Sequence, residues 1–178
     1  MHEAELEDNE ILNAKFYFHY GATAEQAGLY EKAAELFRKS IALDPANSAD
    51  ACNYLGYMWA EQNLHLDEAA EMIKRALKLE PNNGAYLDSL GWVEFRQGKF
   101  DQALADLVRA TQSVSRDDPV VFDHLGDTYL KLNHVPQALE SWQKALILDP
   151  QNKKLADKID NAKTKMSKGQ PPSANPRE

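Results

Sequence analysis

The chain of 178 residues lacks several features that mark common protein classes. Its one cysteine, Cys52, excludes an internal disulfide and a zinc site built from several cysteines. No apolar run approaches the length of about 18 residues that a transmembrane helix needs. Residues 1–5 are acidic and lack the apolar core of a signal peptide. The compartment stays open: the chain is cytoplasmic or, if a signal or lipoprotein anchor has been removed, periplasmic.

Positive charge is also scarce. Lys and Arg total 20 and Asp and Glu total 28, so the formal net charge is −8. Sequence-independent nucleic-acid binding needs a basic face, which argues against a nucleic-acid partner. The C-terminal end is the exception, because residues 153–178 carry seven basic against three acidic side chains. Residues 153–166 keep a helical apolar spacing, whereas residues 167–178 hold three prolines and are predicted to be a disordered tail.

The constellations of enzymes and metal sites are missing too. The sequence has no Gly-rich phosphate loop and no His-Glu-x-x-His, and its 5 histidines lack ligand spacing. Asp123 and Asp127 lie four residues apart, but two carboxylates from one helix supply too few ligands for a metal ion, so a solvated wall is predicted. Cys52 falls on a packing face and is predicted to be a buried small residue. We therefore predict no catalytic residue, no cofactor and no metal site.

What the sequence does contain is a repeat of about 35 residues. Glycines recur in steps of 35, at Gly21, Gly56, Gly91 and Gly126. A second stripe recurs as an alanine, a large apolar residue four positions later and a small residue three further on: Ala33, Phe37 and Ser40; Ala69, Ile73 and Ala76; Ala103, Leu107 and Ala110; Ala138, Trp142 and Ala145. Each unit is predicted to form two helices whose small residues let the backbones approach closely.

These units resemble tetratricopeptide repeats. The fourth unit shows most of that family's pattern, namely Phe122, Leu125-Gly126, Tyr129, Ala138, Trp142, Ala145 and Pro150. The resemblance implies an all-α fold, a right-handed α-solenoid of four helix pairs plus a C-terminal capping helix. The implied divisions are a lead segment 1–13, four units at 14–47, 49–83, 84–117 and 119–152, a capping helix at 153–166 and the tail 167–178.

Two departures from the family pattern predict irregular turns. The second unit has one extra residue near Asn63-Leu64-His65-Leu66, and the third ends in residues 113–118 without a closing proline. In the run Asp117-Asp118-Pro119, the aspartates are predicted to form a turn and cap the following helix. The run from Tyr86 to Arg96, with its neighbours, is similar to the C-terminal repeats of longer bacterial tetratricopeptide proteins. Some of those are outer-membrane lipoproteins that act as adaptors for periplasmic proteases.

The resemblance also implies where a partner binds, because the first helix of each pair lines a concave groove in this family. Carrying the groove positions onto this chain predicts these partner-binding residues: Phe18, Asn53, Tyr57, Asp88, Trp92, Phe95, Arg96, Asp123, Asp127 and Lys131. Further acids at groove positions are Glu25, Asp50 and Glu61, and a further base is Lys15. The predicted groove is thus acidic with an aromatic floor. For Trp92, packing between neighbouring helices is an equal alternative.

The predicted function is that of a non-catalytic scaffold or adaptor, which binds a protein or peptide segment with basic and apolar residues in this groove. Heat-shock co-chaperones of this family clamp an acidic C-terminal tail with lysines, an arginine and asparagines. The matching positions here hold Phe18, Ala22, Ala85 and Ser89, so this clamp is not assembled. The alternative is a structural segment that self-associates or whose groove is filled by another domain. The stretch Glu3–Asn13, with Leu6, Ile11 and Leu12 as anchors, suits that alternative.

Overall fold

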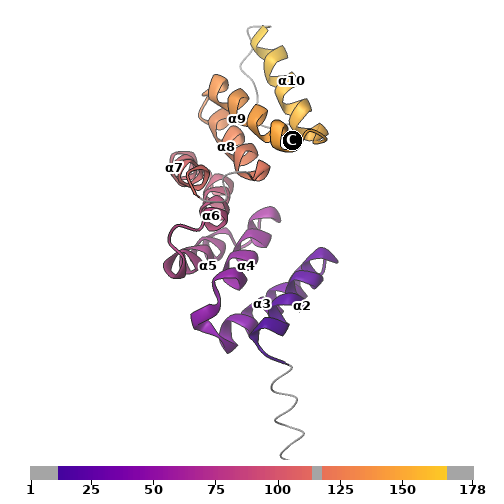
Figure 1. Cartoon of the computed structure of the whole chain (residues 1–178), viewed down its shortest axis with the longest axis vertical. Helices are drawn as coiled ribbons and strands as arrows, with labels where there is room; N and C mark the ends of the chain where they lie inside the picture. The colour runs from indigo at the N-terminus through magenta and orange to yellow at the C-terminus, as the bar shows by residue number, and fades with distance from the viewer. Residues whose placement is uncertain (1–11, 114–117, 168–178) are drawn as a thin grey trace, which may run out of the picture. The chain divides into compact units, whose positions relative to one another are not determined.

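The computed structural model describes residues 12–113 and 118–167, and its regular structure over those residues is entirely helical. The chain divides into two compact units, Met1–Pro81 and Asn82–Glu178, and each contains consecutive helix pairs (Figure 1). In each pair we call the earlier helix the first helix and the later one the second helix. None of the described helices is both long and apolar enough to cross a membrane.

Unit 1 holds two helix pairs. Its elements are α2 (Ala14–Gln26), α3 (Tyr30–Leu43), a short 3-10 helix η1 (Pro45–Asn47), α4 (Ala49–Glu61) and α5 (Leu66–Leu79). The helices α2 and α3 pack along each other, as do α4 and α5. The second helix α3 also packs against α4, and the two first helices touch. A second helix therefore lies against two first helices, its own and the next one.

Unit 2 holds two further pairs and a final helix. Its elements are α6 (Gly84–Arg96), α7 (Phe100–Thr111), α8 (Pro119–Lys131), α9 (Val135–Leu148) and α10 (Lys153–Ser167). The pairs are α6 with α7 and α8 with α9, and α7 packs against α8 just as α3 packs against α4. The described residues thus form four pairs plus a final helix, which confirms the all-α repeat fold expected from the resemblance.

Each first helix begins after a polar residue at the same position of the repeat. These N-cap residues are Asn13, Ser48, Asn83 and Asp118. The side chains of Asn13, Asn83 and Asp118 accept hydrogen bonds from backbone N–H groups of the first helical turn, which have no partner inside the helix. Asp118 accepts from Val120 N at 2.9 Å, so its predicted role as a cap is confirmed.

The turns inside the pairs differ in one place. Three of them contain a single residue with left-handed backbone, namely Gly28, Gly98 and Asn133. The turn between α4 and α5 contains two such residues, Asn63 with φ 55° and His65 with φ 48°. This is the turn with the extra residue, so the predicted irregularity is confirmed. Residues 114–117, which carry most of the second predicted irregular turn, lie outside the described residues.

The two recurring stripes meet inside each pair. The large apolar residues of the second helices are almost fully buried: Phe37, Ile73, Leu107 and Trp142. Each faces the repeated glycine of its own first helix. A Cβ built on Gly21 would lie 2.9 Å from the Phe37 ring, and one on Gly56 would lie 2.6 Å from the Ile73 side chain. The glycines therefore make room for the large residue, as their spacing predicts.

The final helix α10 closes the apolar face of the fourth pair. Its buried residues Leu155, Ile159 and Ala162 join Ala138, Trp142 and Ala145 of α9 in one core cluster. Asn152 caps α10 by accepting a hydrogen bond from Leu155 N at 3.3 Å. Ser167 is the last residue of α10, one residue beyond the predicted end, and residues 168–178 of the predicted tail lie outside the described residues.

Candidate partner-binding surface

The ten predicted partner-binding residues all lie on first helices, three in unit 1 and seven in unit 2. Unit 1 has Phe18 on α2 with Asn53 and Tyr57 on α4, and unit 2 has Asp88, Trp92, Phe95 and Arg96 on α6 with Asp123, Asp127 and Lys131 on α8. The surroundings of these side chains differ sharply between the two units. The acids of unit 2 have partners within the unit.

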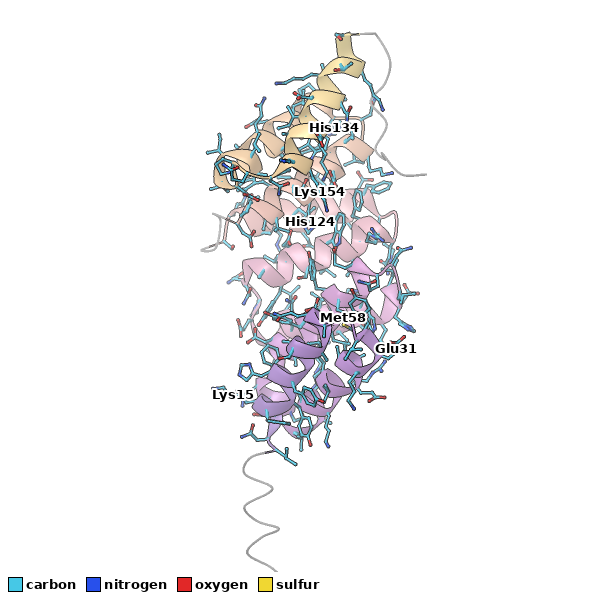
Figure 2. All side chains as sticks on the ribbon, turned by 90° about the vertical axis from the view of Figure 1, so that its right-hand side faces the viewer. Lys15, Glu31, Met58, His124, His134 and Lys154 are labelled. Atoms are coloured by element: carbon cyan, nitrogen blue, oxygen red, sulfur yellow. The ribbon has the colours of Figure 1, made fainter. Side chains whose placement is uncertain are left out.

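Asp88 of α6 forms a buried pair with His124 of α8. The His124 Nδ1 lies 3.0 Å and 3.2 Å from the two carboxylate oxygens of Asp88. Figure 2 labels His124 on α8, and both side chains are more than nine-tenths buried. Burial lowers the pKa of His124, but the charge and hydrogen bond of Asp88, with Asp123 and Asp127 nearby, outweigh it and raise the pKa above 6.5. The Asp88 carboxylate thus joins two first helices and is not open to a partner.

Trp92 packs in a stack of rings between α6 and α8. Its ring lies 4.1 Å from the His124 ring on one side and 4.9 Å from the Phe95 ring on the other, both nearly parallel. The Arg96 guanidinium carbon lies 5.7 Å from the Trp92 ring centroid. Only 9% of Trp92 is exposed, so of the two alternatives for this residue the structure has the packed one. Phe95 and Arg96 are half-buried at the end of α6.

Asp123 and Asp127 do not form an open wall on α8. The ammonium of Lys158, on α10, lies 2.5 Å from Asp123 Oδ1 and 2.8 Å from Asp127 Oδ1. The Trp142 Nε1 donates a further hydrogen bond to Asp127 Oδ1 at 3.1 Å. The two carboxylates therefore attach α10 and α9 to α8. The sequence carried a signal for this contact, because Lys158 follows Asp123 by one repeat length of 35 residues.

The electrostatics of this cluster follow from two carboxylates sharing one ammonium. Burial lowers the pKa of Lys158, but Asp127 and Asp123 together outweigh it and raise the pKa above its usual value. Burial, together with the charge of Asp123, raises the pKa of Asp127 despite the nearby Lys158.

No group of three or more His, Cys, Asp or Glu side chains that could hold a metal ion occurs within residues 12–113 and 118–167. Lys131 is exposed, with its Nζ 6.0 Å from the Phe100 ring centroid.

Unit 1 presents a different surface, which we call the unit-1 face and define by Phe18, Asn53, Tyr54 and Tyr57. The Phe18 ring contacts the Tyr54 ring at 5.2 Å, edge to face, and joins α2 to α4. Tyr54, which is not among the ten predicted residues, is 45% exposed. Asn53 is 9% exposed, and among the described residues its Oδ1 accepts no hydrogen bond. Tyr57 lies half-buried one helical turn after Asn53.

Cys52 neighbours the unit-1 face in sequence but points into the core. It is fully buried, which confirms the predicted burial, and burial raises the pKa of its thiol despite a contact with Ser48. A buried thiol with a raised pKa is a poor nucleophile. Cys52 therefore belongs to the packing of α4.

Comparisons with known proteins agree with this architecture. Models described as Tetratricopeptide repeat match residues 14–47, 60–119 and 119–152. The TPR repeat-containing protein PA4667 of Pseudomonas aeruginosa is 37% identical over 87 residues, which are 49% of this chain and 14% of that protein.

Two solved structures extend the comparison. The structure of PilF from Pseudomonas aeruginosa has a TM-score of 0.77 at 25% identity, covering 87% of this chain and 69% of that one. The thermophilic TPR protein TTC0263 of Thermus thermophilus has a TM-score of 0.74 at 22% identity, covering 91% and 87%. With the family models matching in all four helix pairs, the chain belongs to the tetratricopeptide repeat family.

Proposed function

We propose that this chain is a non-catalytic interaction module that holds a segment of a partner protein against the first helices of its repeats. Tetratricopeptide repeats are typically protein-interaction modules, and both family models that match the chain are of this kind. Within this proposal the unit-1 face is the main contact surface. The acids of unit 2 are less suited to this role, because Asp88, Asp123 and Asp127 already have partners inside the unit.

Asn53 carries the proposal. A buried carbonyl oxygen without a hydrogen-bond donor costs about 1–3 kcal/mol, and such groups in native proteins call for an explanation. A bound segment supplies one, because each of its backbone N–H groups is a donor. The half-buried Tyr57 lies one helical turn further along α4 and belongs to the same proposed contact surface. The neighbouring rings of Phe18 and Tyr54 give apolar side chains of the segment a surface to cover.

The charges on the first helices of unit 1 specify the partner's chemistry. The groove positions of α2 and α4 hold three acids, of which Glu25 is half-buried and Asp50 and Glu61 are exposed. They hold one base, the exposed Lys15. A segment with basic and apolar residues complements this surface, and its binding weakens as salt screens the charges. This is the partner that the sequence predicts, with the contact moved from the whole array to unit 1.

The test uses the full chain as bait in the lysate of its source organism at low salt. We compare the natural chain, the variant Asn53→Ala with Tyr57→Ser, and a control with Lys74→Ala on α5, after circular dichroism shows equal helicity. A partner captured by the natural chain and the control but lost from the first variant supports the proposal. The same partner retained by all three baits contradicts it.

The alternative, self-association, is decided by the same proteins. Sedimentation equilibrium of the natural chain over a hundredfold range of concentration gives its mass. A mass of the natural chain that rises with concentration, together with a monomer mass of the variant Asn53→Ala with Tyr57→Ser, would show that a second copy fills the unit-1 face. That result would replace the adaptor function by assembly.

A further inference from the structure

The opposite side of α2 carries a second apolar surface, separate from the unit-1 face. Phe16 is 38% exposed and Tyr20 is 47% exposed, with ring centroids 6.0 Å apart. Leu12 precedes Phe16 by one turn and Thr23 follows it by two, and both are exposed. These four side chains form one stripe along the helix, which we call the α2 outer face.

The repeat itself indicates what belongs on this face. The residues that follow Phe16 and Tyr20 by one repeat length are Ala51 and Leu55 of α4, and both are buried in unit 1. In α8 the matching residues are Val121 and Leu125, which are also buried. Those helices have a second helix packed against them, α3 against α4 and α7 against α8. The stripe is buried in both helices that have a preceding second helix packed beside them, and the α2 outer face has the same spacing of apolar side chains.

The charges beside the α2 outer face distinguish between possible occupants. Lys15 and His19 lie along one edge of the stripe, and Figure 2 labels Lys15 on α2. On the other edge, the Lys39 Nζ lies 4.1 Å from the Tyr17 ring centroid, and Tyr17 contacts Phe16. The one acid within Ala14–Gln26, Glu25, lies on the far side of the helix. Two copies of this face would bring basic edges together, which disfavours self-pairing.

We propose that the α2 outer face docks an amphipathic helix of a partner protein whose apolar stripe is flanked by acidic side chains. The helix lies on α2 as α7 lies on α8, with apolar side chains against Phe16 and Tyr20. Its acids face Lys15, His19 and Lys39. This site is independent of the unit-1 face, so either proposal can fail without the other.

The probe is a synthetic peptide that copies residues 100–112, the helix α7 with its cap, stapled on its outer side to keep it helical. One version carries Ala105→Glu and Gln112→Glu at one edge of its apolar stripe, and a second carries lysine at both positions. Binding of each fluorescent peptide to the full chain is measured by anisotropy at low salt. Protein variants are Phe16→Ser with Tyr20→Ser, and as matched control Asn53→Ala with Tyr57→Ser.

The proposal expects the glutamate peptide to bind the natural chain and the control equally. Binding to Phe16→Ser with Tyr20→Ser falls about tenfold or more, because two exposed aromatic anchors are lost. The lysine peptide binds about tenfold more weakly than the glutamate peptide, and added salt removes that difference. Both substituted residues are exposed, so the variant keeps its helicity.

Four results overturn the proposal. They are no binding of the glutamate peptide, equal binding of the two peptides, equal binding by Phe16→Ser with Tyr20→Ser, and a dimer that this variant dissociates. The last result would make a second copy the occupant.

A further variant, Leu6→Ser with Ile11→Ser, tests the chain's own N-terminal residues. A tenfold gain in peptide affinity would make that segment the occupant instead, whereas unchanged affinity supports a separate partner.

Discussion

At one position of the repeat the two units carry opposite kinds of side chain. Residues spaced by 35 place Phe18 and Asn53 in unit 1 but Asp88 and Asp123 in unit 2. The two aspartates meet a base on a later helix, His124 for Asp88 and Lys158 for Asp123. Phe18 has no charge to pair, and the Asn53 Oδ1 has no donor among the described residues. The same repeat position thus joins helices to each other in unit 2, whereas in unit 1 it is suited to contact a partner protein.

This difference shows what a count of charges at the groove positions leaves out. Summing acids and bases at groove positions treats every carboxylate as open to a partner. In unit 2 the bases that meet Asp88, Asp123 and Asp127 come from other positions of the repeat or from α10. The Asp88–His124 contact is shielded from water and the Lys158 contacts are partly exposed, and each contact joins two helices of unit 2.

The largest expected effect is the loss of Lys158. Lys158→Met leaves two partly buried carboxylates side by side without a cation and removes the tie between α8 and α10. We expect the free energy of unfolding to fall by roughly 2–4 kcal/mol, measured by urea denaturation. Lys154→Met is the matched control, because Lys154 is exposed on the same helix.

A charge-free version separates the cause from the packing. The triple variant Lys158→Met, Asp123→Asn and Asp127→Asn removes the unpaired charges along with the ammonium, so it should recover most of the lost stability. If the triple variant is as unstable as Lys158→Met alone, the carboxylates are not the reason.

The second effect compares the same glycine in the two units. A Cβ on Gly21 would lie 2.9 Å from the Phe37 ring. A Cβ on Gly126 would lie even closer to the Trp142 indole and overlap it. The indole is also held by its hydrogen bond to Asp127. We expect Gly126→Ala to destabilise by about 2 kcal/mol and Gly21→Ala by about 1 kcal/mol or less, because alanine also favours the helix. Equal losses in the free energy of unfolding, measured by urea denaturation, would show that the second and the first unit adapt equally well to the added methyl group.

The third effect is a pH dependence confined to unit 2. The pKa of His124 is raised in the folded protein above 6.5, so the folded state binds this proton more tightly than the unfolded chain. The stability from the Asp88–His124 pair is therefore complete below about pH 6.5 and is lost as pH rises through the raised pKa. Urea denaturation of the natural chain and of His124→Gln across pH 6 to 9 measures this. A loss of the same size in both proteins would assign the dependence to another group.

The smallest effect concerns Asn53. Asn53→Leu removes a buried acceptor without a donor, so the free energy of unfolding should stay within about 1 kcal/mol of the natural value or rise. Asp88→Leu, at the matching position, leaves His124 without its carboxylate and should cost roughly 2 kcal/mol. Thermal unfolding of both variants checks the contrast. A large loss for Asn53→Leu would mean that its amide holds the fold together.

The local structure followed closely from the repeat. The helix pairs, the N-cap at Asp118, the turn with an extra residue and the burial of Cys52 were all predicted, because each depends on neighbouring residues or on a periodic apolar stripe. The surface was harder to predict. Lys158 belongs to the basic C-terminal end and His124 is one of 5 histidines without ligand spacing, yet each lies about one repeat length from its aspartate.

The sequence by itself determined the family, the pairing of helices and the position of the close contacts, since a glycine opposite a large apolar residue has few other ways to pack. Only the tertiary structure decided which polar side chains are paired within the fold. Whether a carboxylate is open or neutralised depends on side chains that the fold brings from 31 to 36 residues away. Burial then decides how strongly each pair holds, because a charge removed from water needs its counter-charge nearby.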